Sequence, residues 1–449
     1  MAVATTVVHE PFPLSPAQRG LWFAQQLTPH VPICIAQYVD IRGALDVDLF
    51  RRVSLVAAHE FQSVFLRLVD IDGEPHQVVA PPPDAELDVH DFRVAPDPAA
   101  AAREWMDHNH TVGIDLTDDP LTEAALLRIA DDRYFWYTRI HHIALDGHGA
   151  ATMVDRVAEL YTAAFENREP QPNRAADLRT LQQIDNDYRA SGRHQHDRAH
   201  WAARLHSRSA AVTLTDTIAP PSVRSRVARA ALTEDTTARL DASGADTAAR
   251  IVAAFACHLA GATGRQEVLV DIPVSARTTA VLRRSGGMLA NVVPLLVAVR
   301  TDDTVGTLVE RVRLELTGAL RHQRGNVEDI LRELGVNASA RRISSPVVNV
   351  MLFDREWRFG SATADFHILT AGPVPDIMIN IYRSGHPPRT IVEVRANPGR
   401  YTDDEVHRHH ARLVELVDAF ALASSDTSLT GIGAPMCPVL SAVRQARPV

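Results

Sequence analysis

The residues best suited to chemistry lie in one short stretch, His141-His142-Ile-Ala-Leu-Asp146-Gly147. A neutral imidazole can take a proton from an attacking amine or hydroxyl and pass it to a leaving group, because its unperturbed pKa is about 6.5. The ring must be held in one orientation, and a polar residue four positions further on, Asp146, could contribute through partners of its own. A glycine such as Gly147 lets a substrate approach the backbone closely. The stretch therefore indicates proton transfer during nucleophilic attack.

The residues around this motif predict a strand, a turn and a helix in succession. Except for Arg139, residues 134–140 are aromatic or β-branched, which is typical of a strand. After the motif, apolar residues recur at helical spacing as far as Phe165. The motif would then lie where side chains project into a cleft and where the helix offers free backbone N–H groups. The alternative interpretation is a pair of core histidines followed by a helix-capping Asp-Gly.

Length and composition predict two domains in a globular protein of the cytoplasm. A chain of 449 residues is too long for one ordinary core, and domains of roughly 200 residues are expected. The 46% hydrophobic and 22% charged residues are typical of a soluble protein. No apolar run is long enough to span a bilayer, and the N-terminus lacks the features of a secretory signal. Cys34, Cys257 and Cys437 lie far apart, which indicates reduced structural thiols.

Charge and motif content argue against several partners and cofactors. The net charge of -9 argues against nucleic acid as the main partner. The chain has neither a glycine-rich phosphate loop nor a cysteine cluster, so neither a nucleotide nor a metal cofactor of its own is expected. His196 and His200 have a metal-compatible spacing, but no His-Glu-x-x-His motif includes them. A solvated helix face is the better interpretation of that pair.

Strands and helices are predicted in both halves of the chain. Ser15 and Gln18 predict a helix that begins with a capping box. Residues 166–173 have the composition of a linker, and a long polar helix over residues 178–207 would bridge two lobes. The other predicted elements are a hairpin around Asp72-Gly73, helices capped by Asp46, Thr233 and Asp246, helices over 304–322 and 403–423, and strands over 32–41, 223–232, 267–272, 347–353, 377–382 and 390–396. This mixture, present twice, predicts two similar α/β layers.

Taken together, the motifs resemble the condensation domains of nonribosomal peptide synthetases, in a free-standing form. The similarity covers nearly the whole chain and is most specific at His141-His142-x-x-x-Asp146-Gly147. Four weaker motifs occur in the family's order: Leu14-Ser15-Pro-Ala-Gln18-x-x-Leu21-Trp22, Asp271-x-Pro273-Val274-x-x-Arg277, Gly287-Met288-x-x-Asn291-Val-Val-Pro294-Leu295 and Val348-Asn349-Val-Met-Leu-Phe353-Asp354.

The resemblance implies an α/β (α+β) fold of two chloramphenicol-acetyltransferase-like lobes in a V arrangement, with the active site in a tunnel between them. Residues 1–175 would form the N-terminal lobe with the motif, and residues 176–449 the C-terminal lobe with a bridging helix and crossover segments. The donor would be an acyl group held as a thioester on the phosphopantetheine arm of an acyl or peptidyl carrier protein. The acceptor would be a small-molecule or carrier-bound amine or hydroxyl, which would give an amide or an ester.

The resemblance also implies roles for individual residues. His142, the second histidine of the motif, would be the main catalytic residue, and His141 would be structural. Asp146 would pair with Arg277, and Asn349 would line the site. Asp146 is too short and too far along the turn to be assumed a direct partner of His142. A buried ion pair that pins the loop across the lobes is the expected role of Asp146.

Acyl transfer also needs a hydrogen-bond donor for the oxyanion, and the backbone N–H near Gly147 and the amide of Asn349 are the candidates. Two stretches depart from the family's pattern. Gln62-Ser63 stands where the family has an Arg-Thr pair, and His148-Gly149 stands where an aromatic residue and a serine are common. Contacts between the lobes and the shape of the tunnel are the features that these departures affect.

Two other functions are compatible with the motif. One is an acyl-CoA-dependent wax-ester or polyketide-associated O-acyltransferase, since such enzymes share the His-His-x-x-x-Asp-Gly pattern. The other is an inactive module that recruits a carrier or another partner protein. Product formation with carrier-bound or CoA-bound donors distinguishes the three functions.

Overall fold

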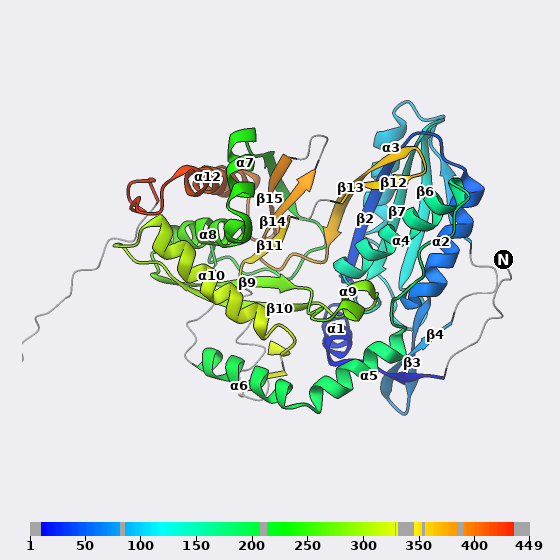
Figure 1. Cartoon of the computed structure of the whole chain (residues 1–449), viewed down its shortest axis with the longest axis horizontal. Coiled ribbons are helices and arrows are strands. Elements are labelled where there is room, and N and C mark those ends of the chain that lie inside the picture. The colour runs from blue at the N-terminus through cyan, green and yellow to red at the C-terminus, as the bar shows by residue number, and fades with distance from the viewer. Residues whose placement is uncertain are drawn as a thin grey trace, which may run out of the picture.

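The computed structural model describes residues 10–80, 86–206, 213–327, 329–330, 345–352, 355–384 and 389–434. Within these residues the chain forms two lobes, each built on a six-stranded sheet (Figure 1). Cys437 and the Phe353-Asp354 end of one motif lie outside the described residues. No helix in the described part of the chain is long and apolar enough to cross a membrane. The division into residues 1–175 and 176–449 stays a prediction.

The sheet of the first lobe is covered by different helices on its two faces. Its strands, in spatial order, are β12 (Trp357–Phe359), β13 (Ala362–Ala371), β2 (Cys34–Arg42), β7 (Arg133–His141), β6 (Thr122–Ala130) and β5 (Asp88–Asp91). Helices α2 (Val47–Phe61) and α4 (Gly147–Phe165) pack on one face, and α3 (Pro98–Asn109) packs on the other. The strand that leads into the motif, β7, is therefore buried on both sides, as its aromatic composition predicts.

Strands β12 and β13 bring a late part of the chain into this first sheet. β13 runs antiparallel to β2, and Ala371 at its end lies opposite Ile35. The register shifts between Ile368 and Thr370, so that Leu369 forms a bulge. Figure 1 shows β13 beside β2, although the two are far apart in sequence. The sequence did not predict β13, because most of its residues are half-buried and the strand lacks a simple alternation.

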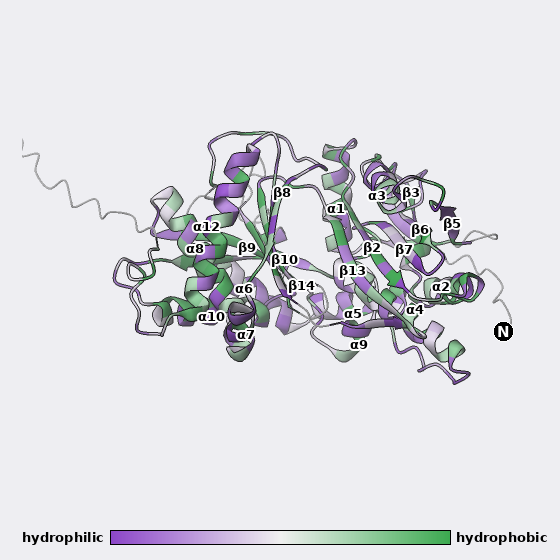
Figure 2. Ribbon diagram, turned by 90° about the horizontal axis from the view of Figure 1, so that it is seen from above, coloured by the Kyte–Doolittle hydropathy of each residue, from purple (hydrophilic) through white to green (hydrophobic). Residues whose placement is uncertain are grey.

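The sheet of the second lobe has one apolar face and one polar face. Its strands, in spatial order, are β10 (Asn291–Ala298), β9 (Glu267–Val274), β11 (Val347–Met351), β14 (Ile377–Ser384), β15 (Arg389–Ala396) and β8 (Arg226–Ala231). Helices α8 (Thr247–Thr263), α10 (Val305–Arg321) and α12 (Asp403–Leu422) pack on the apolar face, and Figure 2 shows hydrophobic residues gathered along α8. The other face carries Asn349, Asn380 and Glu393, which lie in register on adjacent strands.

The remaining elements lie outside these two sheets. They are β1 (Phe12–Pro13), α1 (Pro16–Leu27), η1 (Ser63–Phe65), the hairpin β3 (Leu66–Ile71) and β4 (Glu74–Val79), α5 (Leu178–Arg189), α6 (Gly192–His206), α7 (Glu234–Ala242), η2 (Gly244–Asp246) and α9 (Ala280–Arg284). The capping box is confirmed, because the Ser15 hydroxyl accepts from the Gln18 backbone N–H and the Gln18 side chain accepts from the Ser15 N–H. Cys34 and Cys257 are buried free thiols, as predicted.

Two local predictions are wrong. The single helix expected over residues 178–207 is two helices, α5 and α6, which run along the junction of the lobes (Figure 1). The hydroxyl and the N–H of Ser191 both donate to the Tyr188 carbonyl, which diverts that carbonyl from a continuous helix, and Gly192 is a weak helix former. The predicted cap by Asp246 is the second error: the residue lies at the N-cap position of α8, but its side chain forms no capping hydrogen bond.

Candidate active site

The His-His-x-x-x-Asp-Gly motif spans a strand–turn–helix junction, as predicted. β7 ends at His141, and α4 begins at Gly147. The Asp146 carboxylate caps this helix by accepting a hydrogen bond from the Gly149 N–H at 2.9 Å. The polypeptide therefore turns tightly between a buried strand and a capped helix, and the motif side chains are held at the end of the first sheet.

His141 is packed in the core, as the resemblance implies. Its side chain is fully buried, and its Nδ1 accepts a hydrogen bond from the Ile143 N–H at 3.1 Å. Nε2 therefore carries the proton, which it donates to Oε1 of Gln25 at 3.0 Å. Burial, and then the neighbouring His142 and Arg139, lower the pKa of His141 to about 3. The ring is neutral and structural.

This neutral His141 predicts a loss of stability in mild acid. Its pKa is about 3 in the folded protein and about 6.5 when unfolded, so the unfolded chain binds the extra proton between these values. The contribution of His141 to the free energy of unfolding is complete above pH 6.5, and we expect about 2 kcal/mol of it to be lost at pH 5.

Urea unfolding at pH 7 and pH 5 measures this loss. His141→Gln should reduce the difference in unfolding free energy between the two pH values, whereas His407→Gln on the exposed side of α12 should not. An unchanged difference in the His141→Gln protein would contradict the prediction.

His142 is only partly buried and makes one side-chain hydrogen bond among the described residues. Its backbone N–H donates to the Ile33 carbonyl at 2.9 Å, and its Nε2 lies 3.2 Å from the carbonyl oxygen of Ala371. Because a carbonyl only accepts, Nε2 carries the proton and the lone pair lies on Nδ1. Burial lowers the pKa of His142, while the Ala371 carbonyl and Asp146 oppose that shift. The ring is therefore neutral at pH 7 and able to accept a proton.

Asp146 and Arg277 form a fully buried ion pair, as the resemblance implies. Arg277 Nη1 lies 2.7 Å from Asp146 Oδ2, and the side chains are 0% and 1% exposed. The same carboxylate oxygen accepts hydrogen bonds from the N–H groups of Leu289 and Ala290. Burial raises the pKa of Asp146, but Arg277 and these donors outweigh it, and the net pKa lies below its ordinary value. Asp146 makes no hydrogen bond to His142, so its role is to join the motif to the second lobe.

The two glycines of the motif region differ in what they permit. A Cβ on Gly147 would meet nothing within 4 Å, so the space beside it is open. A Cβ on Gly149 would lie 2.5 Å from Cδ1 of Leu145 and 3.4 Å from Nη2 of Arg277. A side chain at position 149 would therefore displace the end of the Leu145 side chain, while its distance to Arg277 would be that of an ordinary van der Waals contact.

Asn349 is not hydrogen-bonded to the motif. It lies on β11, and its Nδ2 is 3.4 Å from Oδ1 of Asn380 and 3.4 Å from the sulfur of Met351. Asn380 in turn donates to Glu393 at 3.2 Å. Asn349 therefore belongs to a polar row on the second sheet, which faces away from the apolar core of that lobe.

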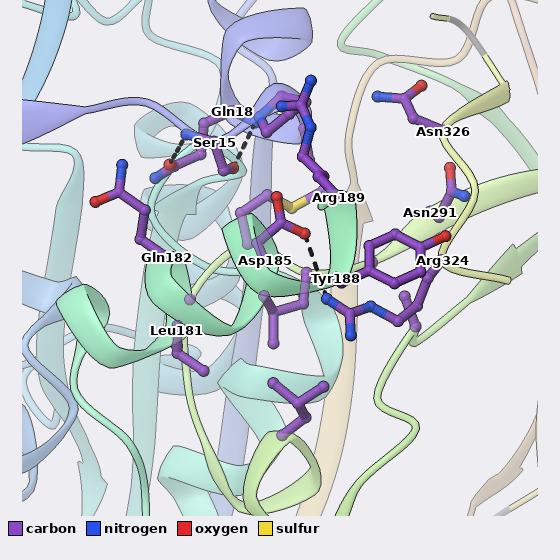
Figure 3. Close-up of a pocket in the computed structure, with 18 of the residues that line it drawn as sticks. Ser15, Gln18, Leu181, Gln182, Asp185, Tyr188, Arg189, Asn291, Arg324 and Asn326 are labelled. Atoms are coloured by element: carbon purple, nitrogen blue, oxygen red, sulfur yellow. Dashed lines mark hydrogen bonds and ion pairs between the residues drawn. The ribbon is translucent and has the colours of Figure 1, made fainter. Parts of the chain in front are cut away.

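A pocket of about 110 Å³ lies between the lobes, next to the Asp146–Arg277 pair. It is lined by α1, α5 and residues 287–291, with Ser15 and Gln18 from the start of α1 and Asp185 and Arg189 from α5 (Figure 3). Arg324 closes one side: it lies 4.0 Å over the ring of Tyr188 and 3.4 Å from the Asp185 carboxylate. His142 does not line this pocket, although Leu289 and Ala290 join the pocket wall to Asp146.

Comparison with known proteins identifies this architecture. The family model called Condensation domain matches residues 8–374, which is most of the chain. The chain belongs to the condensation-domain family. Condensation domains are acyltransferases of nonribosomal peptide synthesis, and this chain is one of them.

The relatives and solved structures agree with this assignment. The chain is 34% identical over 93% of its length to an isonitrile lipopeptide synthase of Streptomyces coeruleorubidus, and 30% identical over 90% to a dimodular nonribosomal peptide synthase of Bacillus subtilis. It covers 29% and 17% of those proteins, so it spans less than a third of either. The starter condensation domain of rhizomide synthetase, in complex with C8-CoA and Leu-SNAC, superposes with a TM-score of 0.87 at 30% identity, covering 94% of this chain and 96% of that one. These structures share the two chloramphenicol-acetyltransferase-like lobes.

The residues that depart from the usual condensation-domain pattern, Gln62-Ser63 and His148-Gly149, contact the second lobe or helix α5. Gln62 adopts a positive φ of 60°, and its Oε1 accepts a hydrogen bond from the Leu178 N–H at the start of α5. Ser63 is buried, close to Gly286. Nε2 of His148 donates to the Arg283 carbonyl at 3.0 Å. The substituted residues therefore take part in the contacts between the lobes.

The described residues contain no group of three or more His, Cys, Asp or Glu side chains that could hold a metal ion. His200, whose spacing from His196 suggested a ligand pair, instead stacks on His322 with the ring centroids 3.9 Å apart. His196 is exposed, whereas His200 is half-buried by this contact, and burial lowers its pKa to about 4.

Proposed function

We propose that this condensation domain transfers an acyl group from a phosphopantetheine thioester to an amine, with His142 as the residue that takes the proton of the amine. The observation that carries the proposal is the state of His142: its neutral ring lies at the motif turn, is partly exposed and is hydrogen-bonded through one nitrogen, while the other has no partner among the residues that the structure describes. Such a ring can act as a general base at neutral pH.

The proposed reaction needs little beyond positioning and one proton transfer. The amine nitrogen attacks the thioester carbonyl carbon, the C–N bond forms and the C–S bond breaks. His142 accepts the amine proton and returns it to the departing thiolate. Good alignment of two bound reactants can contribute up to about 7–11 kcal/mol, and a general base adds roughly 10²–10⁴-fold.

The similar proteins suggest the class of both substrates. One solved relative is described in complex with C8-CoA and Leu-SNAC, and one curated relative as a lipopeptide synthase. We therefore propose a medium or long acyl chain as donor and an aminoacyl thioester as acceptor. Coenzyme A and carrier proteins present the same phosphopantetheine arm, and a carrier protein is the expected donor partner.

The other site residues have supporting roles in this proposal. Asp146 and Arg277 hold the motif turn against the second lobe. The backbone N–H of Gly147, beside open space, and the amide of Asn349 are the proposed donors to the oxyanion.

The pocket in Figure 3 is the proposed entrance for the acceptor, because polar groups of both lobes line it and its wall reaches Asp146. Ala17→Trp, at the rim on α1, should raise KM for the acceptor about tenfold without lowering kcat. Ala100→Trp, exposed on α3, is the matched control and should change neither constant. An unchanged KM in the Ala17→Trp enzyme would exclude this entrance.

Intact-protein mass spectrometry tests the function directly. The protein is mixed with C8-loaded carrier or C8-CoA, and with aminoacyl-loaded carriers or free amines and alcohols. A mass increase on the aminoacyl carrier supports the proposal. Transfer to alcohols alone would identify an O-acyltransferase, and no transfer from any donor would identify an inactive recruiting module.

A further inference from the structure

Among the described residues, the backbone carbonyl of Ala371 is the only hydrogen-bond partner of the His142 side chain. It lies 3.2 Å from Nε2, at the end of β13, the strand that crosses from the second half of the chain into the first sheet. Gly372 follows with a φ of +110°, and a Cβ there would lie 3.6 Å from Nε2 of His142. The backbone at 371–372 therefore lies directly against the imidazole.

Thr370 stabilises this piece of backbone through hydrogen bonds from its own side chain to Gly372. Its side chain is buried, and its hydroxyl donates to the Gly372 carbonyl at 3.0 Å and accepts from the Gly372 N–H at 3.3 Å. These two bonds close a small turn around Ala371. Because the turn is otherwise free to bend at a glycine, the Thr370 hydroxyl fixes the direction in which the Ala371 carbonyl points.

Arg395 holds the same strand from the second lobe. It lies on β15, and its guanidinium donates to the carbonyls of Leu369 at 2.6 Å and Ile368 at 3.3 Å. These carbonyls are at the bulge of β13, two and three residues before Ala371. A bulge leaves backbone groups outside the ladder, and Arg395 satisfies them from the other lobe.

A buried carboxylate keeps Arg395 in this position and connects it to Asn349. Glu393 Oε1 lies 2.5 Å from Nε of Arg395, and the side chains are 4% and 12% exposed. The same oxygen accepts from Asn380 at 3.2 Å, and Asn380 accepts from Asn349 at 3.4 Å. One hydrogen-bonded chain therefore joins the polar face of the second sheet to the strand that contacts His142.

We propose that the Ala371 carbonyl orients His142 for proton transfer, and that Thr370 and Arg395 are positioning residues that hold this carbonyl in place. The inference rests on the proposed role of His142. The Ala371 carbonyl accepts a hydrogen bond from Nε2–H, which fixes the tautomer of the ring and leaves Nδ1 as the base. A buried carboxylate orients the catalytic histidine in the same way in a catalytic triad. Because Arg395 comes from the second lobe, the orientation of the His142 ring depends on how the two lobes pack against each other.

Weakening this arrangement should affect the chemical step rather than substrate binding. We expect kcat to fall about 10- to 100-fold with KM nearly unchanged. The hydrogen bond from Nε2 to Ala371 raises the pKa of His142, so its loss should shift the acid limb of the pH–kcat profile to lower pH. Asp146 also raises that pKa, and the other adjacent titratable group, His141, is neutral; neither is altered by the substitutions.

The first test replaces Thr370 by Val, which keeps the shape of the side chain and removes the hydroxyl. Its matched control is Thr390→Val, since Thr390 is equally buried and its hydroxyl has no partner in the described part of the chain. The expected result is a loss of kcat and a shifted acid limb for Thr370→Val alone. Equal kcat values and equal profiles for the two variants would overturn the proposal.

The second test replaces Arg395 by Gln, with Arg395→Lys as the conservative variant. Arg311→Gln is the matched control, because Arg311 on α10 likewise pairs with a buried carboxylate, Asp303, and donates to a backbone carbonyl. We expect Arg395→Gln to lose kcat, Arg395→Lys to recover part of it, and Arg311→Gln to lose only stability. A loss of kcat without a shift of the acid limb in any variant would refute orientation through Ala371.

His142→Ala separates failure of this inference from failure of the proposed function. An inactive His142→Ala protein beside fully active Thr370→Val and Arg395→Gln proteins would refute the positioning role alone. A fully active His142→Ala protein would refute the proposed function, and with it the premise of the inference. An inactive His142→Ala protein with both positioning variants impaired as described supports both.

Discussion

His142→Ala should abolish most of the acyl transfer while leaving the fold intact. An alcohol stays protonated at neutral pH and needs a base during attack, so we expect the rate with alcohol acceptors to fall roughly 10²–10⁴-fold. An amine with a pKa near 8 is partly neutral already and loses its proton late, so its rate should fall less. Single-turnover rates with paired amine and alcohol acceptors on the same donor measure both effects.

The partly buried position of His142 makes a large loss of stability unexpected for this variant, because its side chain makes one hydrogen bond to a backbone carbonyl. Its thermal unfolding curve serves as the control. Equal losses with amine and alcohol acceptors would contradict the proton-transfer role and would indicate that the ring only shapes the site.

Asp146→Ala should lose both stability and activity. The substitution leaves the Arg277 guanidinium buried without its counterion and removes the acceptor of three backbone N–H groups, those of Gly149, Leu289 and Ala290. Breaking one side of a buried ion pair costs about 3–5 kcal/mol. We expect a clearly lower Tm together with a loss of kcat, measured by calorimetry and by the single-turnover assay.

The double variant Asp146→Ala/Arg277→Met distinguishes an unpaired charge from a lost contact. Removing both charges should restore part of the stability that Asp146→Ala loses, because the penalty of a buried unpaired guanidinium disappears. Activity should not return, since the motif turn is still detached from residues 287–290. An Asp146→Ala protein with wild-type Tm and no activity would contradict the bridging role.

The sequence was most informative where side chains alone determine the structure. The aromatic run before His141 and the Ser15 capping box each follow from residue type and spacing, and the structure confirms them. The resemblance added the pairing of Asp146 with Arg277, which lie 131 positions apart and which no local pattern connects. Long-range pairs of this kind need either a related protein or a fold.

The sequence was least informative where the backbone makes the contact. The partners of His142 and Arg395 are carbonyl groups of Ala371, Leu369 and Ile368, and any residue type at those positions would present the same oxygen. β13 itself was not predicted, so its crossing into the first sheet and its bulge were not foreseen. The break between α5 and α6 depends on one serine and one glycine within an otherwise helical polar run.

Affinity labelling with bromoacetyl-CoA tests most directly whether a phosphopantetheine thioester reaches His142. The reagent carries an alkylating carbon next to the thioester carbonyl, so a ring nitrogen at the site of attack should be alkylated. Peptide mass spectrometry should locate one label on His142 and none on the buried His141, and excess C8-CoA should prevent labelling. Labelling elsewhere with none on His142, or labelling of His142 that C8-CoA does not reduce, would contradict the account.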